Sequence, residues 1–118
     1  MLSKRYRFHS RGGVRFVYQN GKTIRSPKMS LVFVDNPKGF TRFGVTISKK
    51  VEKSAVKRNF IRRRVYEALR KNIDLIPKKR DYLFVIYAKE VGKMPFSELE
   101  AALGQLVEES KVCYNTRK

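Results

Sequence analysis

The stretch that most constrains this chain runs from residue 48 to residue 72, SKKVEKSAVKRNFIRRRVYEALRKN. It carries ten Lys or Arg residues against two Glu residues, although four apolar residues recur in it at helical spacing: Ile61, Val65, Ala68 and Leu69. At about 100° per residue, these four side chains fall within roughly a third of the circumference of a helix. The stretch is therefore predicted to form a helix from about Ser54 to Asn72 that packs on a core with one side.

A second line of side chains follows one flank of this helix at spacings i, i+3, i+4, i+7 and i+11: Asn59, Arg62, Arg63, Tyr66 and Arg70. Guanidinium, amide and phenol groups in such a line can bind several phosphates of a folded RNA at once. Lysines extend the patch through the preceding turn: Lys49, Lys50, Lys53 and Lys57. A solvated charged face normally mixes both signs in i,i+4 pairs, and only Glu52 and Glu67 are available here. The flank is therefore predicted to bind a polyanion.

The overall charge supports this prediction. The 118 residues carry a formal net charge of +18, which favours a polyanionic partner because it destabilises a compact chain by self-repulsion. Nucleic acid is preferred over a membrane surface, since no long apolar run is present. We expect residues 1–118 to form a single RNA-binding domain, with a basic arm at 1–9 and a C-terminal tail at 111–118. The single cysteine, Cys113, cannot form an intramolecular disulfide, which is consistent with a cytoplasmic location.

Hydrophobic patterning predicts an α/β arrangement. A short helix is expected from Ser10 to Asn20, ending at Gly21. KMSLVFVDN (28–36) and FTRFGVTISKK (40–50) are predicted strands, and the short connection between them predicts an antiparallel hairpin. The second strand alternates, so that Arg42, Thr46 and Ser48 lie on a polar face.

The remaining elements are an interior strand and an acidic helix. DYLFVIYAK (81–89) is apolar almost throughout, as expected for a strand that is buried on both faces. The last helix is predicted to begin with a capping box formed by Ser97 and Glu100. Its apolar stripe is Leu99, Ala102, Leu103, Leu106 and Val107.

No catalytic centre is evident in the sequence. The ten acidic residues are scattered or sit on the last helix, His9 is isolated in the basic arm, and Cys113 has no His or Asp nearby. The sequence contains no P-loop, zinc-ligand spacing or nucleophile elbow. We therefore expect that the protein alone catalyses no reaction.

Several motifs resemble the protein subunit of bacterial ribonuclease P. They are Ser48-Lys49-Lys50-Val51, Ala55-Val56-x-Arg58-Asn59, Ile61-Arg62-Arg63, Arg42-x-Gly44, Val17-Tyr18-x-x-Gly21 and the apolar strand that begins at Asp81. Their order and spacing cover about residues 4–110. Phe60 departs from the family signature, which has a second arginine there, and Val14 stands where relatives commonly have Phe.

The resemblance implies a fold and a function. The fold is an α/β (α+β) two-layer sandwich with a four-stranded, mixed, mainly antiparallel sheet and packed helices. It contains a left-handed strand–helix–strand crossover and is ribosomal protein S5 domain 2-like. The family's protein joins a catalytic RNA that removes the 5′ leader of precursor tRNA. The RNA and its Mg²⁺ ions carry the chemistry, and no obligate protein partner is implied.

Two sets of site residues follow from the resemblance. The catalytic RNA would contact Lys49, Lys50, Lys53, Lys57, Arg58, Asn59, Arg62, Arg63 and Arg70. The single-stranded leader would lie in a cleft formed by Val14, Tyr18, Phe33, Arg42, Thr46 and Ser48. Whether the protein itself holds a metal ion is left open. The alternative is a small ribosomal or ribosome-assembly RNA-binding protein, which would share the size and charge but not the order of these motifs.

Overall fold

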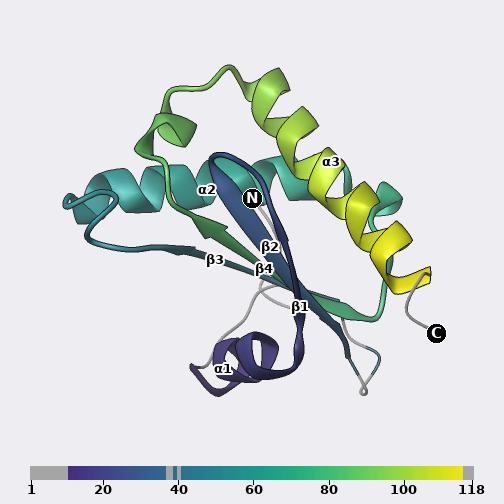
Figure 1. Ribbon diagram of the computed structural model, residues 1–118. Helices are drawn as coiled ribbons and strands as arrows, with labels where there is room; N and C mark the ends of the chain where they lie inside the picture. The colour runs from purple at the N-terminus through teal and green to yellow at the C-terminus, as the bar shows by residue number, and fades with distance from the viewer. Residues whose placement is uncertain (1–10, 37–38, 40, 116–118) are drawn as a thin grey trace.

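A computed structural model of the chain describes residues 11–36, 39 and 41–115, and it describes the side chains of 15–36, 39 and 41–111 (Figure 1). The elements in chain order are α1 (Arg11–Asn20), β1 (Lys22–Arg25), β2 (Met29–Asp35), β3 (Arg42–Ile47), α2 (Ala55–Lys71), η2 (Ile73–Leu75), β4 (Arg80–Ile86), η3 (Lys89–Gly92) and α3 (Phe96–Asn115). The helix predicted before Gly21 and the basic helix are confirmed. The predicted arm at 1–9 lies outside the described residues. Most of the predicted C-terminal tail is helical, because α3 continues to Asn115.

The four strands form one mixed sheet in the order β1-β2-β4-β3. β1 pairs antiparallel with β2, β2 pairs antiparallel with β4, and β3 runs parallel to β4. Because β3 and β4 are parallel, α2 serves as the crossover between them. The predicted fold class and the interior position of β4 are thus confirmed, and the left-handed sense of the crossover stays a prediction.

The predicted hairpin between β2 and β3 is wrong. β4 lies between these two strands and pairs with both, for example through Phe84, which is opposite Leu31 on one side and Val45 on the other. The physical reason is that β4 is apolar on both faces and buried over most of its length. Such a strand is most stable where it has a neighbour on each edge and a helix layer on each face.

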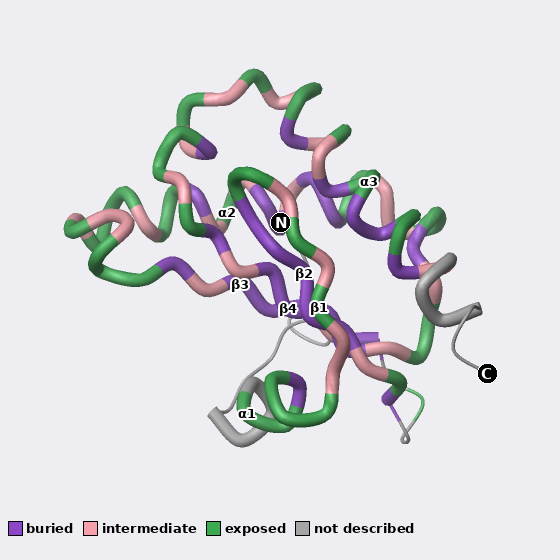
Figure 2. The backbone as a smooth tube through the Cα atoms, in the orientation of Figure 1, coloured by how far each residue is buried: buried purple, intermediate pink, exposed green. Residues whose placement is uncertain are grey.

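The main core lies between the sheet and the two long helices, α2 and α3 (Figure 2). Phe43 on β3 and Tyr82 on β4 stack there with their ring centroids 5.4 Å apart. The predicted stripe of α2 is buried in this core from Ile61 to Leu69. Tyr66 is buried with it, so its predicted place on the cationic flank is wrong: the apolar stripe is wider than four residues.

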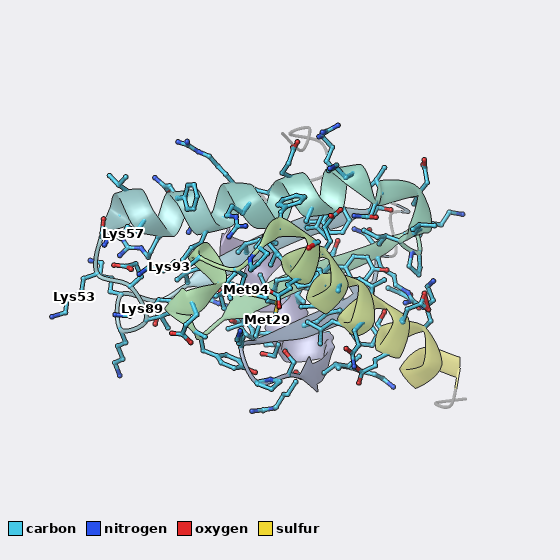
Figure 3. The ribbon with its side chains drawn as sticks, turned by 90° about the horizontal axis from the view of Figure 1, so that it is seen from above. Met29, Lys53, Lys57, Lys89, Lys93 and Met94 are labelled. Carbon is cyan, nitrogen blue, oxygen red and sulfur yellow. The ribbon has the colours of Figure 1, made fainter. Side chains whose placement is uncertain are left out.

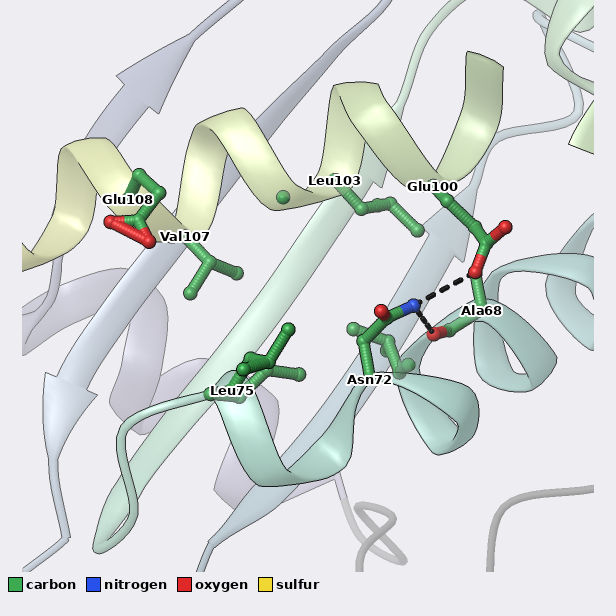
Figure 4. A pocket seen from close by; sticks show the side chains of 10 residues that line it. Ala68, Asn72, Leu75, Glu100, Leu103, Val107 and Glu108 are labelled. Carbon is green, nitrogen blue, oxygen red and sulfur yellow. Dashed lines mark hydrogen bonds between the residues drawn. The ribbon is translucent and has the colours of Figure 1, made fainter. Parts of the chain in front are cut away.

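Side-chain caps define both ends of α2. At its start, Ser54 Oγ accepts the Lys57 N–H at 3.3 Å. At its end, Asn72 Nδ2 donates to the Ala68 carbonyl and to Glu100 Oε2, each at 2.9 Å, and so joins α2 to α3 (Figure 4). The predicted capping box of α3 is wrong, because the helix already includes Phe96 and Ser97 lies within its first turn.

The opposite face of the sheet is covered by α1, whose Val17 is fully buried against Val32 and Leu83. Gly21 permits this arrangement, because a Cβ at that position would lie 2.6 Å from the Val17 carbonyl oxygen and 2.8 Å from the Phe33 carbonyl oxygen. Both contacts are with backbone atoms, which cannot rotate away. The close approach of α1 to β2 therefore requires glycine at the turn.

We predict that Gly21→Ala lowers the free energy of unfolding by about 1–3 kcal/mol, since overpacking against backbone forces α1 away from the sheet. Urea denaturation measures this change. Gly104→Ala is the matched control: a Cβ there meets no atom within 4 Å, and in the helix interior it should stabilise the protein by about 0.5–1 kcal/mol. Equal effects of the two substitutions would contradict the packing argument.

Candidate nucleic-acid interface

The turn before α2 presents the first group of cations. The Ser48 carbonyl accepts the N–H groups of Val51 at 3.1 Å and Glu52 at 3.2 Å, which closes a tight turn. Ser48 itself is exposed, and so are the predicted RNA contacts Lys49 and Lys50 at the tip of the turn. Lys53 and Lys57 are also exposed, and Figure 3 shows them at the same end of the molecule.

The α2 residues Arg58, Asn59 and Arg62 are held in place by neutral partners. Arg58 Nη1 donates to the backbone carbonyls of Glu52 at 2.9 Å and Lys53 at 3.0 Å. Arg62 donates from Nη1 to Asn59 Oδ1 at 2.7 Å and from Nε to the Val45 carbonyl at 3.3 Å. These bonds position both guanidinium groups without cancelling their charge, so the helix and the turn form one fixed cationic surface.

We use the name cationic surface for eight residues of α2 and the turn before it: Lys49, Lys50, Lys53, Lys57, Arg58, Asn59, Arg62 and Arg63. In the described part of the chain, no salt bridge reaches any member of this set. Arg70 differs from them, because it makes two hydrogen bonds to the Glu67 carboxylate, at 2.9 and 2.7 Å. The Arg70 guanidinium lowers the pKa of Glu67 to about 2, so the carboxylate stays ionised and offsets the charge of Arg70.

The predicted cleft residues are divided between the two faces of the sheet. Thr46 is half-buried on the same face as α1, where its β4 partner is Val85. On α1, Tyr18 is 50% exposed and directly follows the buried Val17. The backbone of Val14 lies in α1, but its side chain is outside the described residues. Tyr18, Thr46 and the adjacent Ser48 therefore remain candidates for one surface.

Phe33 does not belong to that surface, and its predicted place in the cleft is wrong. Its side chain is fully buried in the main core with α2 and α3. Its neighbours Val32 and Val34 point to the α1 face instead. Side chains alternate along a strand, so Phe33 and Tyr18 lie on opposite sides of the sheet. A cleft wall and a core residue have the same apolar character in a sequence, which explains the error.

Arg42 is bound to a carboxylate within the fold. Its Nε donates to Asp81 Oδ1 at 3.1 Å and its Nη2 donates to Oδ2 at 3.0 Å. Asp81 is only 1% exposed and also accepts the Asn36 Nδ2–H at 2.8 Å. The Arg42 side chain is 33% exposed, so Arg42 joins β3 to β4 and can offer a ligand only part of its surface.

We predict that Asp81→Asn lowers the free energy of unfolding by about 1–3 kcal/mol, because it removes the charge and one acceptor from a buried network. Thermal and urea unfolding measure the loss. Glu108→Gln, which removes one partner of an exposed pair with Lys111, should change the same quantity by less than about 1 kcal/mol. A negligible effect of Asp81→Asn would show that the network is not structural.

Sequence reasoning missed a second group of cations on η3. Lys89 and Lys93 line a pocket together with Lys57 and Phe60 of α2. They lie about thirty positions after Lys57 and Phe60 in the sequence, so helical spacing carries no signal of this proximity. Only the tertiary contact between η3 and α2 brings them together.

Within the described ranges, no three His, Cys, Asp or Glu side chains lie close enough to hold a metal ion. No helix among the same residues is both long and apolar enough to span a membrane. His9 and the side chain of Cys113 lie outside the described residues.

Comparison with known proteins identifies the family. The model of the Ribonuclease P family matches residues 2–111. The chain belongs to the ribonuclease P protein family. The ribonuclease P protein component of Syntrophus aciditrophicus is 34% identical over 107 residues, which are 90% of this chain and 87% of that protein. The component from a Picosynechococcus species is 35% identical over 69 residues, 58% of this chain and 60% of that protein.

A solved structure supports the fold. The ribonuclease P protein of Staphylococcus aureus aligns with a TM-score of 0.78 at 22% identity, over 92% of this chain and 98% of that chain. The ribonuclease P family match decides against the ribosomal or ribosome-assembly alternative. As a member of this family, the chain is the protein component of the endoribonuclease that matures the 5′ end of tRNA.

Proposed function

We propose that the cationic surface binds the RNA subunit of ribonuclease P and that the α1 face of the sheet binds the 5′ leader of precursor tRNA. The proposal that the cationic surface binds the RNA subunit rests on one observation, which is that its positive charges are not neutralised within the protein. Seven Lys and Arg residues of the cationic surface have no carboxylate partner among the described residues, although the chain contains ten acidic residues. A surface left with its charge uncancelled gains free energy when it displaces the counterions of a polyanion.

The position of these charges on α2 strengthens the argument. The first turn of α2 contains no acidic residue, and Lys57 and Arg58 lie close to the helix start. A helix N-terminus carries a partial positive charge, so cations there repel it and reduce stability. An RNA phosphate would relieve this repulsion, because the positive end of the helix dipole and the cations both attract an anion. The arrangement costs stability in the free protein and favours the complex.

The second half of the proposal rests on Tyr18, Thr46 and Ser48. An exposed aromatic ring beside a polar strand can stack on unpaired bases without selecting a sequence. Leaders of different precursors share a phosphate backbone and a single-stranded form, so such tolerance suits them. Arg42 would contribute mainly by fixing β3 against β4.

The bond cleavage is proposed to take place on the RNA subunit. Mg²⁺ held mainly by that RNA would supply the activation of water and the stabilisation of the leaving oxygen. The described residues of the protein contain no cluster suited to a metal ion. The protein would position the leader and reduce the repulsion between the two RNAs. We further propose that residues 1–118 act as one RNA-binding domain in the cytoplasm, where the precursors would be processed.

We predict that the triple variant Lys49→Ala, Lys50→Ala, Arg63→Ala weakens assembly with a bacterial ribonuclease P RNA. If each substitution removes one phosphate contact, the negative slope of log K against log salt should become less steep by about 0.7–0.9 per residue. Filter binding over a salt series measures it. These three residues are exposed, which limits effects on folding.

The matched control removes the same charge elsewhere, with Lys28→Ala, Lys78→Ala and Lys111→Ala. These lysines lie in the β1–β2 turn, after η2 and on α3. If both triple variants reduced the slope equally, the effect would come from net charge, and the assignment of the cationic surface would be contradicted.

We predict that Tyr18→Ala weakens the binding of precursor tRNA to the holoenzyme by about 5- to 100-fold and leaves the binding of mature tRNA unchanged, because only the precursor offers unpaired bases to stack. Phe16→Ala is the control, since Phe16 is also exposed on α1 but lies on the other flank of Val17. A larger effect of Phe16→Ala would place the leader along the opposite side of the helix.

A further inference from the structure

Phe60 is an exposed aromatic side chain in the middle of the cationic helix. It stands where the family signature has an arginine, and it follows Val56 by one helical turn on the side away from the core. Val56 is 78% exposed and Phe60 is 52% exposed, so burial explains neither residue. A large ring kept half in water beside many cations needs another explanation, and its surroundings supply one.

Phe60 forms one wall of an open pocket between α2 and η3. The pocket has a volume of about 330 Å³. Three elements line it. α2 contributes Lys57, Phe60 and Ile61, and the turn before α2 contributes Glu52. η3 contributes Lys89, Glu90 and Gly92, and Lys93 directly follows η3. Figure 3 shows Lys57, Lys89 and Lys93 gathered at one end of the molecule, with Lys53 beside them. Two elements distant in sequence therefore bring one aromatic ring and three lysines to the same pocket.

Arg64 fixes η3 against α2 and thereby sets the geometry of the pocket. Its Nη1 donates to the Val91 carbonyl at 2.9 Å, and its Nη2 donates to the Met94 carbonyl. The same guanidinium lies 5.9 Å from the centroid of the Phe60 ring. A cation near an aromatic face restrains that ring. Arg64 is thus a positioning residue that holds the ring and the loop in a fixed relation.

Gly92 shows how closely the loop approaches the helix. A Cβ added to Gly92 would lie 3.1 Å from Ile61 Cγ1, which is tighter than an ordinary contact. Ile61 is itself buried in the core. The backbone at Gly92 therefore packs directly on the buried Ile61, and Lys89 and Lys93 are presented by a segment that Arg64 bonds to α2.

We propose that this pocket is a binding site for an unpaired RNA nucleotide, whose base stacks on Phe60 while its flanking phosphates contact Lys57, Lys89 and Lys93. The chemistry fits each component. An aromatic ring offers a stacking surface to any base, and lysine binds phosphate as a point charge. Glu52 and Glu90 repel phosphate from their side of the pocket, and a carboxylate can accept a hydrogen bond from an N–H group of a base, such as N3–H of uracil.

This inference rests on the proposed function in one respect, because it requires that the chain binds RNA. The nucleotide could be supplied by the RNA subunit or by the precursor tRNA, and both offer the same chemistry to the pocket. The pocket lies beside the cationic surface and shares Lys57 with it. Stacking at Phe60 would thus add a base contact to a surface that otherwise binds phosphates.

The absence of tryptophan from the chain allows a direct test. In Phe60→Trp, the new residue is the single indole in the protein, and it keeps a stacking surface. We expect a single-stranded dodecamer of uridylate to quench its emission, because a stacked base shortens the excited state. Inorganic polyphosphate of similar charge should not quench it. In the control, Val56→Trp, the indole lies outside the pocket and should respond weakly to both probes.

Affinity provides an independent readout. Phe60→Ala should weaken binding of the same dodecamer by about 5- to 100-fold, the range found for loss of one base–aromatic stack, whereas Val56→Ala should leave it unchanged. Circular dichroism confirms that the variants are folded. Emission of Phe60→Trp is then recorded with the ribonuclease P RNA alone, and again after addition of precursor or mature tRNA. Quenching at the first step assigns the nucleotide to the RNA subunit, and quenching with the precursor alone assigns it to the leader.

Either of two results would overturn the site. One is unchanged emission of Phe60→Trp with all RNAs together with wild-type affinity of Phe60→Ala. The other is equal quenching by polyphosphate and by the dodecamer. In both cases the salt dependence of assembly through Lys49, Lys50 and Arg63 would still decide the proposed function separately. If the triple variant left the salt slope unchanged while RNA still quenched Phe60→Trp, the nucleotide site would be supported and the assignment of the cationic surface would be contradicted.

Discussion

The burial of one side of α2 against the sheet is the interaction on which the rest of the structure depends. Five side chains of α2 are withdrawn from water into the core formed with β3, β4 and α3: Ile61, Val65, Tyr66, Ala68 and Leu69. Complete burial of a large aliphatic side chain contributes about 1.5–3 kcal/mol. That contribution lets a helix with so many like charges remain folded, and it fixes the direction in which those charges point. The core and the cationic surface are therefore two sides of one element.

Local patterns were sufficient to predict most elements and the α2 stripe. Ile61, Val65, Ala68 and Leu69 were predicted from period alone and are buried. The β2–β3 hairpin could not be excluded from sequence, because strand order depends on which strand gains most from two neighbours, and β4 lies more than thirty residues later. Family resemblance, not local pattern, supplied the correct mixed sheet.

The candidate site was predicted less completely than the fold. The exposed lysines and Arg63 were found by charge and spacing, since a stripe of cations on a helix is visible in a sequence. The pairing of Arg42 with Asp81 was not, because the two residues are 39 positions apart. Phe33 and Tyr66 were misplaced, since aromatic residues occur both in cores and at binding surfaces. Lys89 and Lys93 required the tertiary contact through Arg64.

The order of the strands has a consequence for synthesis of the chain. β4 is central in the sheet but is the last strand in sequence, and both of its partners, β2 and β3, precede it. During translation these two strands emerge with open edges and cannot be joined until residue 86 has left the ribosome. Long-range pairing of this kind is slow and leaves aggregation-prone intermediates. The positive charge of the nascent segment would then repel identical neighbouring chains and limit aggregation before the sheet closes.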